Sequence, residues 1–191
     1  MGTITATTAD LALALGTVIH AASKDAARPV LRSVMLEPGR LGVRAVAADN
    51  YRIAVRDFAG TADGPMILDL DDAATLHKLL RAEKVTSDLT IVAVNPGRAT
   101  ATWAFDSRTL GLRLIDGTYP NYLQVIPAER EGDLTIGLCA AQIAEAVKAH
   151  GGAKGNVRVT VNRESVLVPI IVRPQHDAAD AFEVIMPVAL R

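Results

Sequence analysis

Basic side chains gather on the polar faces of the segments that we expect to be helical. In residues 71–84, His77, Lys78, Arg81 and Lys84 recur at helical spacing and share one side of the helix. Positive helix faces attract the phosphate groups of nucleic acids without reading the bases, although an ordinary solvated face has the same composition. The full set of candidate phosphate-facing residues is Lys24, Arg28, His77, Lys78, Arg81, Lys84, Lys148, His150 and Lys154.

Catalytic chemistry finds little support in the chain. Asp49 and Arg52 stand at a spacing that suits a turn better than a catalytic pair. The glycines of residues 151–155 follow a predicted helix instead of preceding one, which indicates a helix C-terminus and not a phosphate-binding loop. The four histidines are too far apart for a metal motif: His20, His77, His150 and His176. We therefore expect no enzyme activity, no metal and no cofactor.

The single cysteine bears on the compartment. Cys139 cannot form an internal disulfide, which fits a reducing cytoplasm. It stands at a predicted helix start among apolar residues, so a structural thiol is the better interpretation than a nucleophile. The N-terminus has no pattern of a secretion signal, and no apolar run approaches the roughly 20 residues that span a bilayer. We expect a cytoplasmic protein.

The overall charge limits where the basic residues can act. The 191 residues carry a net charge of −1, half of them are apolar and 4% are aromatic. A protein coated with phosphate-binding groups is excluded, but one basic face balanced by acids elsewhere is not. The acids stand mostly outside the predicted helix faces: Asp57, Asp63, Asp106, Glu129, Glu131, Asp133, Asp177, Asp180 and Glu183.

The elements that position these residues form one unit written three times. Apolar residues at helical period predict helices over Asp10–Ala22, Asp71–Lys84 and Cys139–His150. Each helix follows a short β-like run and precedes alternating strands and turns. Repeats of roughly 60 residues indicate modules that bury their apolar faces on one another. The runs before the helices are Thr3–Ala6, Met66–Leu70 and Asp133–Leu138.

The strands are short and joined by hairpin turns, which favours an antiparallel sheet with one face covered by helices, an α+β architecture. Residues 116–132, rich in proline and glycine, are predicted to be a linker. Pro169 falls inside a predicted strand, so that strand should be an edge or carry a bulge. The predicted strands are Val30–Glu37, Leu41–Ala47, Tyr51–Ala59, Leu89–Val94, Ala99–Phe105, Thr109–Leu114, Asn156–Val161, Val166–Arg173 and Phe182–Met186, with turns at Pro38-Gly39, Asp49-Asn50 and 95–97.

Four motifs in this order resemble the bacterial DNA polymerase III β sliding clamp. They lie in residues 22–31, 47–55, 116–122 and 184–190. The resemblance implies the DNA-clamp fold, with three strand-helix-strand repeat units, antiparallel sheets outside and helices inside. It also implies a shortened chain, with a clamp domain of two repeats over 1–127 (1–62 and 63–127, with the linker at 116–127) and a half domain of one repeat over 128–191. The family's N-terminal domain and the first half of its third domain have no counterpart.

In that family a ring encircles double-stranded DNA and tethers the replicative polymerase and the clamp loader, which insert short linear peptides into an apolar pocket. Ala48, Asn50, Gln124 and Ala189 depart from the family's usual residues, and Arg191 is extra, so the preferred peptide is expected to differ. Transferred position by position, the pocket is built from Leu31, Ala48, Asn50, Tyr51, Arg52, Ile53, Pro120, Gln124, Val125, Val184, Ile185, Met186, Pro187, Val188 and Leu190.

The number of repeats predicts the assembly. Rings of this kind contain twelve such units, so a chain of three units should form a homotetramer. Neighbouring units alternate in direction, and the chains should therefore meet through isologous contacts with dihedral symmetry.

Two other functions stay open at this stage. A truncated clamp could remain an open adaptor or decoy that binds clamp-binding peptides and needs no basic lumen. A small enzyme, with chemistry that the sequence does not reveal, is the third alternative.

Overall fold

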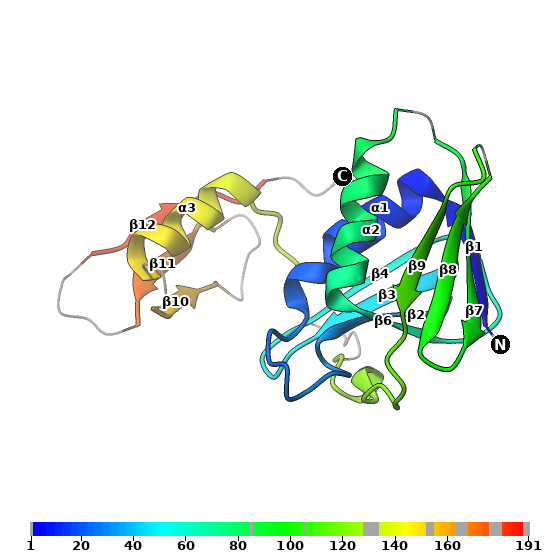
Figure 1. Cartoon of the computed structure of the whole chain (residues 1–191). Helices are drawn as coiled ribbons and strands as arrows, with labels where there is room; N and C mark the ends of the chain where they lie inside the picture. The colour runs from blue at the N-terminus through cyan, green and yellow to red at the C-terminus, as the bar shows by residue number, and fades with distance from the viewer. Residues whose placement is uncertain are drawn as a thin grey trace. The chain divides into compact units, whose positions relative to one another are not determined.

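The computed structural model describes residues 2–84, 86–104, 106–127, 134–151, 155–162, 168–175 and 181–188. The chain divides into two compact units, Met1–Ile126 and Pro127–Arg191 (Figure 1). Several residues named above lie outside the described residues: Phe105, Glu129, Glu131, Asp133, Lys154, His176, Asp177, Asp180, Ala189, Leu190 and Arg191.

The first unit contains two antiparallel sheets. One has four strands in the order β4-β3-β2-β6, and the other has five in the order β5-β1-β7-β8-β9. Every strand pairing within the described residues is antiparallel, which confirms the predicted α+β class. The strands are β1 (Thr3–Thr7), β2 (Ser33–Gly39), β3 (Gly42–Ala48), β4 (Ile53–Ala59), β5 (Thr61–Ala62), β6 (Met66–Asp69), β7 (Asp88–Asn95), β8 (Arg98–Trp103) and β9 (Thr109–Arg113).

The two repeats of this unit exchange strands. The strand before the first helix, β1, pairs with β7 of the second repeat. The strand before the second helix, β6, pairs in turn with β2 of the first repeat. Each sheet therefore contains residues of both repeats, and neither repeat can complete its sheet alone.

Two helices cover one face of these sheets, α1 (Thr8–Val18) and α2 (Leu70–Ala82), and Figure 1 shows them side by side. Asp69 caps α2, because its carboxylate accepts a hydrogen bond from the Asp71 N–H at 3.0 Å. Thr7 caps α1 in the same way through the Asp10 N–H at 3.1 Å. The apolar stripes of both helices are fully buried: Leu11, Ala14, Leu15 and Val18 on α1, and Ala73, Leu76 and Leu80 on α2.

The second unit has one helix, α3 (Ala140–Gly151), and one sheet in the order β10-β11-β12. Its strands are β10 (Val157–Thr160), β11 (Ile170–Pro174) and β12 (Glu183–Ile185). Among the described residues of this unit, the core is small, with four buried hydrophobic residues: Ala146, Ile170, Val172 and Ile185. No helix among the described residues is long and apolar enough to cross a membrane.

Local hydrogen bonds shift several predicted element ends. The strand predicted from Val30 begins at Ser33, because Leu31 and Arg32 both donate to the Arg28 carbonyl and close a turn. The strand predicted from Tyr51 begins at Ile53, after a turn that the Asp49 side chain holds. Pro38-Gly39 is paired strand and not the predicted turn. The first helix ends at Val18 and continues as a 3-10 turn, η1 (Ile19–Ala21).

The predicted linker is wrong in its first part. The 3-10 turn η2 (Tyr122–Gln124) buries Tyr122 against Met35, Val46 and Ile67 of the four-stranded sheet. The Tyr122 hydroxyl donates to the Glu37 carboxylate and accepts from Arg44 at 3.5 Å. Burial and the Glu37 carboxylate raise the pKa of Tyr122. Proline and glycine content indicated a flexible connection, but this aromatic residue fixes the segment to the first unit.

The expectation for Pro169 is also wrong. Strand β11 begins at Ile170, directly after the proline, and it is the central strand of its sheet. The sheet therefore needs neither an edge nor a bulge to accommodate a missing N–H at residue 169.

Candidate functional site

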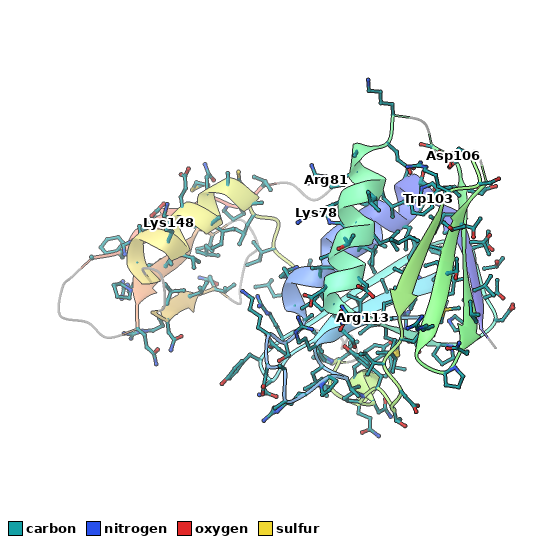
Figure 2. All side chains as sticks on the ribbon, viewed as in Figure 1. Lys78, Arg81, Trp103, Asp106, Arg113 and Lys148 are labelled. Carbon is teal, nitrogen blue, oxygen red and sulfur yellow. The ribbon has the colours of Figure 1, made fainter. Side chains whose placement is uncertain are left out.

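Helix α2 carries the clearest basic face of the first unit. Lys78, Arg81 and Lys84 are exposed, and Figure 2 shows Lys78 and Arg81 on the side of α2 away from the five-stranded sheet. The helix dipole does not oppose this positive face, because Arg81 stands in the last turn of α2, where the dipole is negative. A solvated face with separated cations of this kind suits delocalised attraction to phosphates.

His77 differs from its basic neighbours. It is half-buried and lies against Gly16 of α1, where an added Cβ would stand 2.9 Å from the His77 Nε2. Burial, and then the charge of Arg81, lower its pKa. At neutral pH this imidazole contributes to helix packing more than to the positive face.

The neighbouring helix α1 adds little charge. Its outward side presents Leu13, which is 54% exposed, together with Gly16 and Thr17, and His20 is exposed on η1 directly after it. A shallow hollow of about 460 Å³ lies between α1 and α2 and is bordered by Ala12, Leu13, Gly16, Thr17, His77 and Arg81. The positive face of the first unit is therefore concentrated on α2.

The loop after η1 joins two of the predicted surfaces. Lys24 is exposed, but the Arg28 guanidinium donates to the Asn50 Oδ1 at 2.7 Å and lies 3.6 Å from the Asp25 carboxylate. Arg28 was predicted to face DNA and Asn50 to line the peptide pocket. The structure brings them together, so this arginine also supports the pocket turn.

In the second unit, Lys148 is exposed on α3, as Figure 2 shows. His150 is 14% exposed and its Nε2 lies 3.7 Å from the Glu183 carboxylate of β12. This histidine packs between α3 and the sheet. Its position at the end of the apolar stripe of the predicted helix could have indicated this burial.

A tight turn presents the exposed part of the predicted pocket. The Asp49 Oδ1 accepts from the N–H groups of Tyr51 (2.8 Å) and Arg52 (3.0 Å), and Arg52 Nε donates to the Asp49 Oδ2 at 3.1 Å. The Tyr51 N–H, followed by Arg52, lowers the pKa of Asp49. Asp49 and Arg52 thus form the predicted turn pair, and the turn leaves Tyr51 94% exposed.

The other predicted pocket residues of the first unit come from three segments of the chain and differ in exposure. Ala48 is buried, while Leu31 and Ile53 are half-buried. Pro120, Gln124 and Val125 are exposed on or beside η2. Ligand sites combine a mostly apolar lining with a few polar groups, and these residues are of both kinds.

The residues predicted for the C-terminal part of the pocket belong to the second unit. Met186 is 61% exposed, Val184 and Val188 are also exposed, and Pro187 is half-buried. Ile185 is instead buried in the core with Ala146, Ile170 and Val172. Alternation along β12 explains this difference, because successive side chains point to opposite faces.

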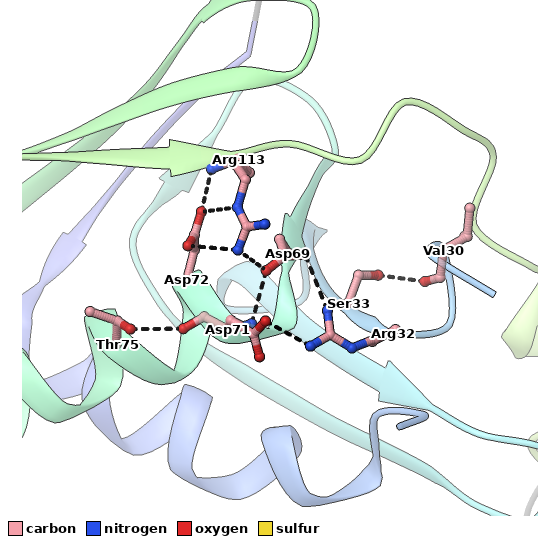
Figure 3. A network of polar contacts seen from close by, with 8 residues as sticks. All are labelled: Val30, Arg32, Ser33, Asp69, Asp71, Asp72, Thr75 and Arg113. Atoms are coloured by element: carbon pink, nitrogen blue, oxygen red, sulfur yellow. Dashed lines mark hydrogen bonds and ion pairs between the residues drawn. The ribbon is translucent and has the colours of Figure 1, made fainter. Parts of the chain in front are cut away.

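An ion network at the start of α2 holds the scaffold of the first unit (Figure 3). The Asp69 Oδ1 accepts from Arg113 Nη2 of β9 at 2.7 Å, and its Oδ2 accepts from Arg32 Nη1 at 3.4 Å. Arg113 also donates its backbone N–H and its Nε to the Asp72 Oδ2 at 2.7 and 3.1 Å. Burial opposes ionisation of Asp72, but the bonds from Arg113 outweigh it and lower the pKa.

Solved structures with the same arrangement are bacterial clamps. A β sliding clamp from Caulobacter crescentus matches 97% of this chain at a TM-score of 0.74 and 23% identity. DNA polymerase sliding clamps from Pseudomonas aeruginosa (TM-score 0.76, 21% identity) and Bacillus subtilis (0.75, 18%) each match over 97% of the chain. The chain has the sliding-clamp fold. It spans about half the length of these clamps, 50%, 51% and 49% respectively, and no family model matches its sequence.

The sliding-clamp fold of this chain also contains a hollow that sequence reasoning missed. A space of about 600 Å³ lies between residues 114–123 and strands β2 and β6. Met35, Ile67 and Tyr119 line it, and Pro120 is the one member of the predicted pocket at its border. Burial raises the pKa of Tyr119 to about 12. The only sequence signal was the aromatic pair Tyr119 and Tyr122 inside the predicted linker.

Proposed function

We propose that this chain is a subunit of a DNA sliding clamp, which encircles double-stranded DNA and tethers a replicative polymerase and a clamp loader. The observation that supports this most is the match of 97% of the chain, over both units, to β sliding clamps at TM-scores of 0.74–0.76. Enzymatic activity is not part of the proposal, since a processivity factor acts by holding its partners together.

The charge distribution fits this function. Lys78 and Arg81 on α2, Lys84 directly after this helix, and Lys148 on α3 are exposed, whereas the protein as a whole carries a net charge of −1. A ring that slides needs weak, distributed attraction to phosphates and no base contacts. A few exposed cations on helix faces supply that, and the acids elsewhere limit adhesion to other nucleic acid.

The tethering surface is the predicted peptide pocket. In the first unit, Tyr51 and Val125 expose apolar surface, and their chain neighbours Asn50 and Gln124 are polar and exposed. In the second unit, Met186 exposes apolar surface. An unbranched methionine adapts to different apolar side chains, which suits a site that receives peptides from more than one protein.

The ring is proposed to contain four copies. The described residues hold three helices that are each followed by strands, with β1 before α1, β6 before α2 and a single bridge at Gly137 where a strand was predicted before α3. Twelve repeats make a ring of this fold in the family that the sequence resembles. A dihedral arrangement makes both faces of the ring equivalent and places peptide pockets on each.

Retention on closed DNA tests the proposal. The purified chain is loaded, with or without a clamp loader, onto nicked circular plasmid, and the protein that comigrates with DNA is measured before and after linearisation. A sliding clamp stays on the circle and leaves the linear form by its ends. Equal retention on circular and linear DNA, or none on either, contradicts encirclement.

A second function is favoured by one observation. The outward side of α1 is neutral and exposes Leu13, which a DNA-facing surface does not require. An open, non-encircling adaptor that binds clamp-binding peptides would keep Tyr51, Val125 and Met186 and need no basic lumen. It predicts peptide binding without any difference between circular and linear DNA.

A further inference from the structure

We propose that the second unit pairs with the second unit of another copy of this chain, each copy laying residues 134–138 along the outer edge of the other copy's β10. This inference depends on the proposed ring only for the number of copies in the full assembly. The interface between two second units could form in an oligomer of any size. The pairing would complete a domain of two repeats, of which each copy holds one.

The first unit shows what each strand before a helix requires. On one side, β1 pairs with β5 of its own repeat, and on the other with β7 of the second repeat. Strand β6 has the same surroundings, with a bridge from Leu68 to Leu114 of its own repeat and full pairing to β2 of the first. Each such strand therefore lies between its own repeat and another.

In the second unit only half of this arrangement is present. Gly137 forms a bridge to Val188 of its own repeat, and the Val188 N–H donates to the Gly137 carbonyl at 2.9 Å. Within the described ranges, no strand pairs with the opposite side of residues 134–138, and none pairs with the outer edge of β10. These are the two edges that β1–β7 and β6–β2 pairing would join.

The backbone of β10 offers hydrogen-bonding groups to that edge. Gln175 donates its N–H to the Asn156 carbonyl at 3.0 Å, and the register pairs Val157 with Pro174 and Val159 with Val172. Because hydrogen-bonded pairs alternate in an antiparallel ladder, Val157 and Val159 direct their N–H and C=O groups away from β11. Pro174, opposite Val157, has no N–H and agrees with this parity.

The helix of the second unit is also incompletely covered. Counted from the first helical residue, Val147 of α3 holds the position of Leu15 in α1 and His77 in α2. Leu15 is fully buried, and His77 is half-buried against Gly16 of α1, whereas Val147 is 39% exposed. A second copy of α3 would cover Val147 much as α2 covers α1.

A second copy is the occupant that satisfies both edges at once. Under a two-fold axis, residues 134–138 of each copy meet β10 of the other, so the interface is isologous and closes without leaving either edge free. The exposed Val159 on β10 and Val147 on α3 become buried together, which stabilises the pair by the hydrophobic effect.

The test measures self-association of the full chain by analytical ultracentrifugation. Val159→Pro removes an outward N–H while leaving the bonds to β11, and Val147→Glu places a charge at the helix contact. The dissociation constant of the joint should rise at least about tenfold for each, because the symmetric interface loses every contact twice. A tetramer should then fall to dimers held by its other joint. Circular dichroism checks that both variants remain folded.

Matched controls use the same elements. Val159→Ile keeps the N–H, the strand propensity and the apolar side chain, and Ala149→Glu adds the same charge on the opposite flank of α3, so both should associate like the wild-type chain. Wild-type association by both Val159→Pro and Val147→Glu overturns the proposal, as does a monomeric wild-type chain. Retention of the wild-type chain on circular DNA is measured separately. If the wild type is retained but both variants associate normally, only this inference is contradicted. If the variants associate more weakly but the wild type is not retained, only the clamp function is contradicted.

Discussion

At the scale of single residues, position decides what a positive charge can do. Lys78 is exposed on the α2 face that we propose to contact DNA, and Arg98 is exposed on β8 of the five-stranded sheet. Reversing either charge changes the net charge of the protein by the same amount. Only the reversal at Lys78 should change how affinity for DNA depends on salt, since that dependence counts the phosphates that a protein neutralises.

The expected result is a loss of about one in the slope of log affinity against log salt, per subunit that contacts phosphate, for Lys78→Glu. Fluorescence anisotropy with a short linear duplex across a salt series measures it. Arg98→Glu should leave the slope unchanged. Equal slopes in the two variants would show that Lys78 does not face the duplex.

The exposed basic residues could be predicted from the sequence, and their packed neighbours could not. Helical spacing places Lys78 and Arg81 on one side of a helix whatever packs against the other. His77 belongs to the same face by spacing, but it is half-buried because Gly16 of a different helix leaves room for its ring. The burial of His77 depends on a contact with another helix, and no local sequence pattern predicts that contact.

At the scale of elements, the start of α2 is where three parts of the first unit meet. Asp69 caps the helix and binds both Arg32, ahead of β2, and Arg113 on β9. Asp72 binds Arg113 alone and Asp71 binds Arg32 alone. Because Asp71 and Asp72 both stand in the first turn, substituting either one changes the interaction with the helix dipole alike.

Asp72→Asn should lower the free energy of unfolding at pH 7 by about 1–2 kcal/mol, since it weakens hydrogen bonds to a charged group. The folded pKa of Asp72 lies below its ordinary value of 3.8. This stabilisation is therefore full above that value and disappears as the pH falls through the folded pKa. Urea denaturation at a series of pH values measures the difference from the wild type.

Asp71→Asn is the control. The Asp71 carboxylate is 62% exposed beside Arg32, and exposed pairs contribute little, so its effect should stay below about 0.5 kcal/mol. Equal losses in the two variants would assign the effect to the helix dipole and not to Arg113.

The same scale shows what sequence patterns can and cannot predict about the fold. All three helices begin within two residues of their predicted starts, because capping residues and apolar period are local signals. The exchange of β1 and β6 between repeats could not be seen, since pairing depends on contacts between residues far apart in the chain. Tyr122 was missed for a similar reason: proline and glycine dominate its segment, while its partners Glu37 and Arg44 lie on other strands.

At the scale of the whole molecule, the predicted peptide pocket draws on both units. Tyr51 and Val125 belong to the first, and Met186 and Val188 to the second. If these residues form one pocket, a single peptide must touch both units. Substitutions in different units should then weaken binding of the same ligand, which local contacts in either unit alone cannot produce.

Tyr51→Ala and Met186→Ala should each reduce the affinity for a fluorescein-labelled peptide that carries a polymerase clamp-binding motif by more than about 1 kcal/mol, as truncation of a central contact does. Leu41→Ala, an exposed apolar residue of the first unit outside the predicted pocket, should have no effect. Neither pocket variant touches β10 or Val147, so the solution mass should stay that of the wild type.

The double variant should lose less than the sum of the two single losses, because residues that enclose the same ligand group couple. A loss for Tyr51→Ala with none for Met186→Ala would confine peptide binding to the first unit and contradict the predicted role of Met186.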